Sequence, residues 1–283
     1  MKKRVCLFLL VCCLVCCWVL PARADSGPKP SVVVDFFGLA GETYFATLLS
    51  DSDSSGPWIA GEAYADYYGP QDVWEAFTDY GAGQEAFYFL GFYQDCTESQ
   101  SLSWTYYPPE RFRILLYFPE REQFLVSAAV YERYAFDSYY GATANLETGT
   151  LVVERSYDWM GQILAFGCRV LLTLGVELIL AWVFGFRSRY AFQVVLVTNL
   201  ITQILLNLLL NGIFYARGAF AFVFYYVWLE ILVLVIEGVI YRTLLVRNWT
   251  RPGKPHPWLY VSAANGASLG LGLLVANWIP GIF

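Results

Sequence analysis

The sequence predicts a membrane protein in which a β-rich (α+β) extracytoplasmic domain precedes a four-helix transmembrane bundle. Three observations support this: a signal-like N-terminus, an acidic segment before residue 156, and four apolar stretches after it. The chain is 57% hydrophobic and 15% charged, whereas soluble domains carry roughly 25% charged residues. The low charge is confined to the part of the chain after residue 155, so the two parts differ in character.

Residues 1–24 have the three parts of a secretory signal peptide. Residues 2–4 are basic, residues 5–20 form an apolar run, and residues 22–24 read Ala-Arg-Ala, a small-residue cleavage motif. We expect cleavage after Ala24. The apolar run is short for a span, which needs about 20 residues, but an uncleaved anchor is the alternative.

Residues 25–155 are predicted to form one α+β or β-sandwich-like domain. Their number, about 130, is enough to bury a hydrophobic core. Strand-forming residues and turn signals predict strands near 31–37, 86–93, 102–107 and 146–154, a hairpin of 111–118 with 123–130, and a short helix after Pro70.

This domain contains 20 acidic and 6 basic residues, a net charge of −14, and many tyrosines. The charge argues against nucleic acid as a partner and favours cations or a basic protein. Tyrosine side chains suit the recognition of a ligand or partner protein. The alternative is that they pack in the β core, where half-buried tyrosines are common.

Residues 51–62 resemble the calcium-binding loop of an EF-hand. Oxygen ligands fall at loop positions 1, 3, 5 and 12, which are Asp51, Asp53, Ser55 and Glu62. An EF-hand also needs a helix on each side, and residues 42–49 are a weak candidate for the first. Calcium is therefore the only cofactor that the sequence suggests, and a solvated Asp/Ser/Gly connection between two strands is the alternative.

Four apolar stretches follow, each long enough to cross about 30 Å of hydrocarbon. They lie near 159–185, 190–212, 219–241 and 257–280, within a domain of residues 156–283. The first and third connections together carry six Lys or Arg residues and the second carries one. By the positive-inside rule, residues 25–155 and the second connection then lie outside a multi-pass protein of the plasma membrane, with the lipid bilayer as a partner.

Polar residues within these spans form a predicted intramembrane cluster. Its members are Arg169, Glu177, Asn199, Gln203, Asn207, Glu230, Glu237 and Asn265. Counting from the outer span ends at 1.5 Å per residue, Arg169, Gln203 and Glu230 lie about 15 Å deep. Glu177 and Glu237 lie about 27 Å deep, with Asn199 and Asn265 nearby. We expect Arg169 to pair with Glu230, because an unpaired charge in hydrocarbon is costly.

The cluster contains more carboxylates than cations, which is typical of a proton or cation path. The alternative is a structural role, in which Asn and Gln hydrogen-bond between helices and Glu237 reaches Arg187 or Arg242 near the inner face. The absence of Gly- and Pro-interrupted helices, which are usual at transport sites, favours the structural role.

The sequence carries no catalytic signature. Its one histidine, His256, lies between two prolines at the start of the last span, which excludes a histidine-based triad in the outer domain. After cleavage only Cys96 and Cys168 remain, too few for a disulfide scaffold. An enzyme is not indicated.

The second and third spans resemble a pattern found in uncharacterised bacterial multi-pass membrane proteins. The matching residues are Asn199, Thr202 and Gln203 (N-x-x-T-Q), followed by Glu230 and Glu237 (E-x6-E). The resemblance implies that these polar residues act together, and it implies no activity.

We therefore expect a component of the bacterial cell envelope whose outer domain binds a ligand or partner protein, in sensing or in assembly. The alternative is an ion- or proton-coupled transport component that uses the intramembrane Glu, Asn and Gln residues. An intramembrane enzyme is a third hypothesis. Ligand binding by the outer domain alone would favour the first, and a pH-dependent flux that Glu230→Gln abolishes would favour the second.

Overall fold

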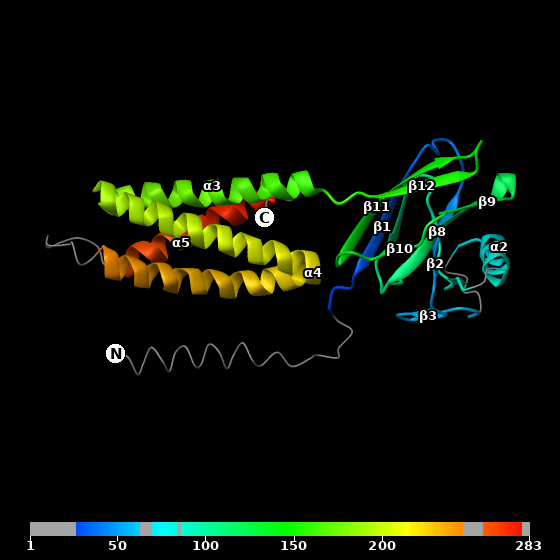
Figure 1. Ribbon diagram of the computed structural model, residues 1–283, viewed down its shortest axis with the longest axis horizontal. Helices are drawn as coiled ribbons and strands as arrows, with labels where there is room; N and C mark the ends of the chain where they lie inside the picture. Colours follow the sequence, from blue (N-terminus) through cyan, green and yellow to red (C-terminus); the bar gives the residue numbers. More distant parts are fainter. Residues whose placement is uncertain (1–26, 63–68, 84–85, 246–256, 279–283) are drawn as a thin grey trace.

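A computed structural model describes residues 27–62, 69–83, 86–245 and 257–278 and shows a β domain followed by long helices (Figure 1). The predicted order of a β-rich domain and then helices is confirmed. The last strand ends at Arg155 and the first long helix begins at Trp159. The predicted signal peptide, residues 1–24, lies outside the described residues.

Two sheets face each other in the β domain. The first has the order β12-β11-β1-β7, in which β1 and β11 run parallel. Its strands are β1 (Ser31–Phe37), β7 (Ser101–Trp104), β11 (Asp137–Asn145) and β12 (Thr150–Arg155). The second sheet has the order β10-β8-β2-β5, with β6 on β2 and β9 on β8. Its strands are β2 (Phe45–Ser50), β5 (Tyr88–Phe89), β6 (Gln94–Asp95), β8 (Arg111–Phe118), β9 (Gln123–Val126) and β10 (Tyr131–Glu132).

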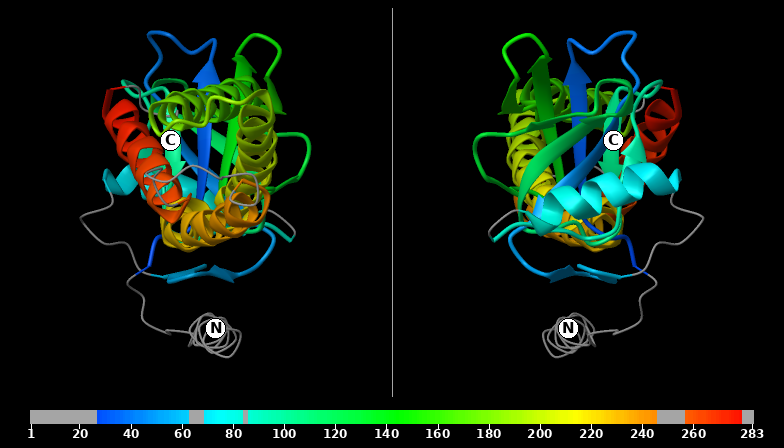
Figure 2. Two further views of the ribbon diagram at one scale, coloured as in Figure 1. Left: turned by 90° about the vertical axis from the view of Figure 1, so that its left-hand side faces the viewer. Right: turned by 90° about the vertical axis from the view of Figure 1, so that its right-hand side faces the viewer.

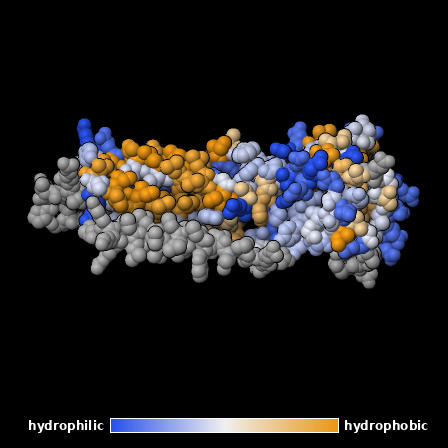
Figure 3. Space-filling model, turned by 60° about the horizontal axis from the view of Figure 1, so that its bottom comes forward, coloured by the Kyte–Doolittle hydropathy of each residue, from blue (hydrophilic) through white to orange (hydrophobic). Residues whose placement is uncertain are grey.

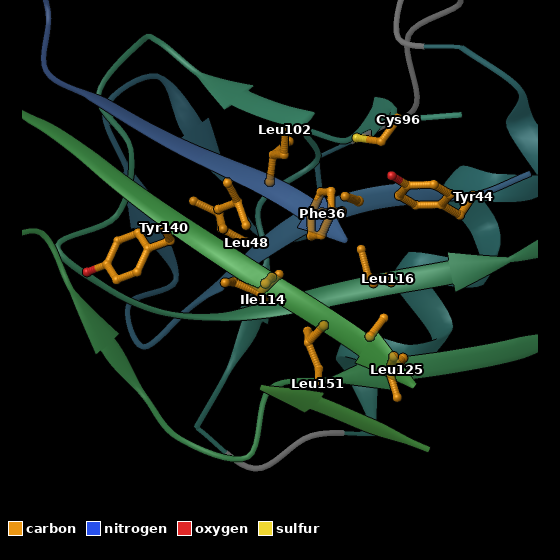
Figure 4. Packing of buried hydrophobic residues seen from close by; sticks show 14 of the residues in the cluster. Phe36, Tyr44, Leu48, Cys96, Leu102, Ile114, Leu116, Leu125, Tyr140 and Leu151 are labelled. Atoms are coloured by element: carbon orange, nitrogen blue, oxygen red, sulfur yellow. The ribbon is translucent and has the colours of Figure 1, made fainter. Parts of the chain in front are cut away.

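The main core lies between these sheets. In β1, alternate residues point inward, and Val32, Val34 and Phe36 are buried, because side chains of a strand alternate between its two faces. From the second sheet, Ile114 and Leu116 of β8 pack into the same cluster (Figure 4). These side chains exclude water from one continuous apolar layer, which is the main stabilising contribution to such a domain.

A helix, α2 (Gln71–Ala82), covers the other face of the second sheet, at the end of the molecule away from the long helices (Figure 2). It packs Trp74 and Phe77 onto Phe45 and Leu49 of β2. β2 is therefore buried on both faces along its whole length. This explains why its sequence, Phe-Ala-Thr-Leu-Leu-Ser, lacks the alternation of a half-buried strand.

Three sequence predictions for this domain need correction. The weak helix predicted at 42–49 is wrong, because Phe45–Ser50 is the strand β2. Only Tyr88–Phe89 of the strand predicted at 86–93 is extended in a sheet. Gly91 ends it with a positive φ of 74°, where an added Cβ would lie 2.7 Å from Trp74. The strand β11 was not predicted. The hairpin of β8 and β9 is confirmed.

The helical unit consists of α3 (Trp159–Val183), α4 (Arg189–Leu244) and α5 (Pro257–Trp278). Gly218 interrupts α4 with φ 78° and ψ −178°, and the two halves run in opposite directions (Figure 1). The connection predicted over 212–218 is thus wrong in extent, since helix continues to residue 217. Glycine alone allows so sharp a reversal at low cost, because it has no Cβ to clash.

Apolar side chains cover the outside of the helical unit (Figure 3). Polar side chains of the same helices are buried inside it. In α3 the buried residues Ala165, Arg169, Thr173, Glu177 and Ala181 recur every four positions, with Val170 buried beside them. α3 and α4 are long and apolar enough to cross a membrane.

The β domain contacts the turn at Gly218. The backbone N–H of Phe136 donates to the carbonyl of Tyr215 at 2.9 Å, and the N–H of Ser31 donates to the carbonyl of Phe136 at 3.0 Å. The rings of Tyr134, Tyr157 and Tyr215 meet beside this contact. We call the end of the helical unit at this contact the outer end.

Candidate functional site

The structure divides the predicted intramembrane cluster into two groups. The inner group contains Glu177, Asn199, Glu237 and Asn265, which are joined by hydrogen bonds. The outer group contains Arg169, Gln203, Asn207 and Glu230, which line one cavity. Apart from Asn207, to which no depth was assigned, these sets match the two depths expected from residue counting along the spans.

Glu177 lies on the buried face of α3, with none of its surface exposed. Its Oε2 accepts a hydrogen bond from Asn199 Nδ2 at 3.2 Å and lies 3.1 Å from the hydroxyl of Tyr260. The same hydroxyl is 3.1 Å from the backbone carbonyl of Glu177. The first half of α4 and the start of α5 therefore both converge on this carboxyl group.

Glu237, on the second half of α4, is also fully buried. Its Oε1 lies 2.7 Å from the hydroxyl of Thr202, and its Oε2 accepts from Asn265 Nδ2 at 2.9 Å. Asn199 connects the two carboxyl groups, because its side-chain amide donates to Glu177 and its backbone carbonyl lies 3.2 Å from the hydroxyl of Thr202, which contacts Glu237. The same amide donates to Tyr241 at 2.9 Å. The inner group is thus one network spanning α3, both halves of α4, and α5.

Within the residues that the structure describes, every donor that reaches the two carboxyl groups is neutral. Burying an ionised carboxylate costs several kcal/mol even after relaxation, unless a counter-charge accompanies it. Two such groups in one network add mutual repulsion to this cost. A proton or a bound cation is therefore needed to neutralise them.

The hydrogen-bond inventory at Thr202 fits this requirement. Thr202 carries one hydroxyl hydrogen, and its oxygen lies 3.0 Å from the Thr198 carbonyl as well as 2.7 Å from Glu237. A Ser or Thr hydroxyl inside a helix commonly donates to the carbonyl four residues earlier. If Glu237 carries a proton, it donates to Thr202, and the hydrogen of Thr202 serves Thr198.

Three buried oxygens of the inner group have no hydrogen-bond donor in the described part of the chain. They are Glu177 Oε1, Asn199 Oδ1 and Asn265 Oδ1. An unsatisfied buried acceptor costs about 1–3 kcal/mol. Turning over the amide of Asn199 or Asn265 would not help, because the neighbouring carboxylate would then lose its donor. A set of unsatisfied acceptors, all of them oxygens, is chemically suited to a proton or a small hard cation.

Three further residues join the hydrogen-bond network of the inner group and were not predicted: Thr202 as a carboxyl partner, Tyr241 and Tyr260. Tyr241 follows Glu237 by four residues, so helical periodicity places it on the same face and could have identified it. Tyr260 lies near the start of α5, at the position that aromatic residues of the membrane interface usually occupy, which concealed its role.

Arg169 is placed against two amide side chains of α4. It donates through Nε to Asn207 Oδ1 at 2.8 Å and through Nη2 to Asn211 Oδ1 at 2.9 Å, and its expected pairing with Glu230 stays a prediction. Arg169 and Glu230 line the same cavity of about 350 Å³. The four-residue spacing of Asn207 and Asn211 presents both amides to the guanidinium.

The predicted calcium loop adopts a tight hairpin of β3 (Ser54–Ser55) and β4 (Trp58–Ile59), preceded by a strand. Asp51 forms an ion pair with Arg111 at 3.0 Å, and the Ser55 hydroxyl donates to the Tyr107 carbonyl. Across residues 27–62, 69–83, 86–245 and 257–278, no group of three or more His, Cys, Asp or Glu side chains is placed to hold a metal ion. Calcium binding by Asp51, Asp53, Ser55 and Glu62 stays a prediction.

Several tyrosines of the β domain belong to its core. Tyr44 and Tyr140 are buried, and burial raises the pKa of Tyr140 to about 12. Burial likewise raises the pKa of the core thiol Cys96 to about 12. Tyr88, Tyr106, Tyr107 and Tyr139 are more exposed. Packing in the β core is therefore confirmed for Tyr44 and Tyr140, and recognition of a ligand or partner by the exposed tyrosines stays a prediction.

Comparison with known proteins gives no family assignment: no family model, curated protein or solved structure matches the chain. The resemblance of the second and third spans to bacterial multi-pass proteins stays a prediction. Function is therefore inferred from the geometry of the inner group.

Proposed function

We propose that the chain is a multi-pass protein of the plasma membrane whose helical unit binds a proton or a small monovalent cation at Glu177 and Glu237, in ion- or proton-coupled transport. The predicted β-rich domain, residues 25–155, lies outside. The observation that carries the proposal is the burial of both carboxyl groups among neutral donors and unsatisfied oxygens.

Membrane insertion is supported by the polarity of the helical unit, which is the reverse of that of a soluble protein. Leu171, Ile179 and Val183 are more than half exposed, while Arg169 and Glu177 of the same helix are buried. In water this arrangement would expose a large apolar surface. In a bilayer it places the apolar side chains in hydrocarbon and the polar ones inside the bundle.

The structural interpretation of these polar residues predicts that their hydrogen bonds are complete. Interhelical hydrogen bonds stabilise membrane helices when both partners are satisfied. The inner group instead leaves three acceptors without donors, and Glu237 contacts Thr202 and Asn265, not the arginines expected near the inner face. A bound proton or cation supplies what is missing, so the transport alternative now has the stronger support.

The proposal is tested by thermal unfolding of the full-length protein in lipid nanodiscs. The apparent Tm would be measured in sodium chloride and in choline chloride at several pH values. A ligand that binds only the folded state stabilises it by mass action, about 2.7 kcal/mol at 100 times its Kd. We expect Tm to rise with sodium or with falling pH, and Glu177→Gln and Glu237→Gln to remove that dependence.

The matched control is Glu154→Gln, the same substitution at an exposed position of β12. It should leave the dependence unchanged. A wild-type Tm that is independent of sodium and pH, or a dependence that both inner-group variants retain, would contradict the proposal.

Sensing by the outer domain is the second candidate function. It is favoured by the direct hydrogen bond from Phe136 of the β domain to Tyr215 of α4, which connects the domain to the helix that carries Glu237. The ring of Phe136 also packs on Gly218 beside this hydrogen bond. If the domain reports on an external ligand or partner protein through this packing, Phe136→Ala, which removes the ring and keeps the backbone N–H, should change the sodium or pH dependence of Tm while leaving the inner group intact.

A further inference from the structure

The cavity of the outer group is distinct from the inner group. Its volume is about 350 Å³, and α3, both halves of α4, and α5 all contribute to its lining. The lining includes charged and amide side chains as well as apolar ones: Gln162, Arg169, Gln203, Asn207, Asn211 and Glu230 supply most of the polar groups. Polar side chains thus gather in a cavity whose remaining lining is apolar, inside a helical unit whose exterior is apolar.

The cavity is elongated along the helices. On α3 it extends from Gln162 to Thr173, which is about 16 Å at 1.5 Å per residue. Phe214 and Ala219, which flank the turn at Gly218, also line it, so one end reaches the outer end of the helical unit. Glu230 lies well beyond that turn, and therefore marks the deep end.

Polar cavities of this size hold water, whereas cavities that stay empty are apolar. The volume is sufficient for several water molecules, and the polar side chains of the lining offer them hydrogen-bond partners. A lipid acyl chain is a poorer occupant, because it would leave the amides and the two charged side chains without solvation.

We infer that this cavity is a water-filled vestibule, open at the outer end of the helical unit, and that Glu230 is the first carboxylate that a proton or a small monovalent cation meets on its way to Glu237 and Glu177. The inference rests on the proposed function. Glu230 and Glu237 lie seven residues apart on one face of α4, which separates them by about 10 Å along the axis. Arg169 of α3 lines the same vestibule, and Tyr226, one turn before Glu230 on α4, is hydrogen-bonded to the Glu230 side chain.

Vestibule hydration is tested by thiol accessibility in the full-length chain. The five cysteines of residues 1–24 are replaced by alanine, and single cysteines are introduced as Ser268→Cys and Thr173→Cys, two lining positions on different helices. A small, charged, membrane-impermeant methanethiosulfonate reagent is applied from the outer side of intact cells. Cys96 is buried in the β core and is a constant background.

The chain supplies its own control. Cys168 precedes Arg169 on α3 but is exposed on the outside of the helical unit, which is the lipid-facing surface in a membrane. Thiols react as thiolates, which form in water and not in hydrocarbon. We expect both lining cysteines to react roughly ten-fold or more faster than Cys168. Ala264→Cys, one turn from Ser268 but in the inner packed cluster, should stay unreactive.

Equal, slow reaction of Ser268→Cys, Thr173→Cys and Cys168 would overturn the inference and point to a lipid-filled cavity. Faster reaction from the inner side than from the outer side would also overturn it. Two lining positions are used so that a folding defect in one variant does not decide the result. The sodium and pH dependence of Tm is independent of this labelling, so failure of the vestibule and failure of the inner-group site are distinguishable.

Discussion

The ring of Phe136 packs directly on Gly218, so that a Cβ added to Gly218 would lie 2.5 Å from it. The first residue belongs to the β domain and the second is the turn of α4. Gly218 thus has two roles: its positive φ reverses the helix, and its missing side chain admits the outer domain.

Gly218→Ala should therefore be strongly destabilising. The substitution combines a left-handed backbone, which costs roughly 1–2 kcal/mol for a residue with a Cβ, with the clash against Phe136. We expect a loss of about 2–4 kcal/mol, measured as a lower midpoint of denaturant unfolding in nanodiscs. Gly212→Ala is the control, since Gly212 is helical with nothing near its added Cβ, and it should be neutral or stabilising.

Tyr260→Phe removes one donor to Glu177 while keeping the ring that packs on Phe186 and Tyr241. Loss of a buried hydrogen bond costs about 1–2 kcal/mol. We expect a lower Tm and, because Glu177 loses a donor, a shifted sodium or pH dependence. Tyr190→Phe, at an exposed position, serves as the control. An unchanged dependence in Tyr260→Phe would show that the hydroxyl does not act on the site.

A double-mutant cycle should place Arg169 with Asn207. Arg169→Leu leaves Asn207 Oδ1 and Asn211 Oδ1 without this donor, and the expected cost is about 1–3 kcal/mol. The unfolding free energies of Arg169→Leu and Asn207→Leu should be non-additive by at least about 0.5 kcal/mol. Arg169→Leu with Glu230→Leu should be closer to additive. The opposite ranking would support the pairing of Arg169 with Glu230 that is expected from the sequence.

The β domain should lose stability in alkaline solution. Burial raises the pKa of Cys96 from about 9 to about 12 and that of Tyr140 from about 10 to about 12. The unfolded chain therefore releases these protons at lower pH than the folded chain. Their stabilising contribution is complete below pH 9 and is lost as the pH rises toward 12. Tm of the full-length protein should fall over this range, and alkylation of Cys96 should remain slow until unfolding.

Cys96→Ala tests the cause of that alkaline loss. The variant lacks the thiol and should show a weaker fall of Tm between about pH 9 and pH 11, although its Tm at neutral pH is lower because a core side chain is truncated. If wild type and variant fall in parallel, ionisation of this thiol does not contribute.

Much of the architecture could be predicted from residue patterns. Length and hydropathy identified the helical stretches, and strand-forming residues with turn signals identified β1 and the hairpin of β8 and β9, because these signals are local in the sequence. β2 was missed because burial on both faces removes the alternation. The extent of α4 was missed because glycine at 212 and 218 looks alike in sequence, and only the second has a positive φ.

The grouping of polar residues was predictable by depth, since rise per residue is fixed within a helix. The partners were not. Arg169 could reach Glu230, Asn207 or Asn211 from the same depth, and the choice depends on how the helices are rotated about their axes. The orphaned oxygens of Glu177, Asn199 and Asn265 likewise appear only when all partners are in place.

Infrared difference spectroscopy tests the central claim most directly, because it observes the protonation of carboxyl groups inside the folded protein. In choline chloride at neutral pH, wild type should show the C=O absorption of a protonated carboxylic acid, reduced in Glu177→Gln or Glu237→Gln and unchanged in Glu154→Gln. If sodium is the bound cation, adding it should abolish that band. A spectrum with only ionised carboxylates, insensitive to sodium and identical in all three variants, would contradict a proton or cation site at Glu177 and Glu237.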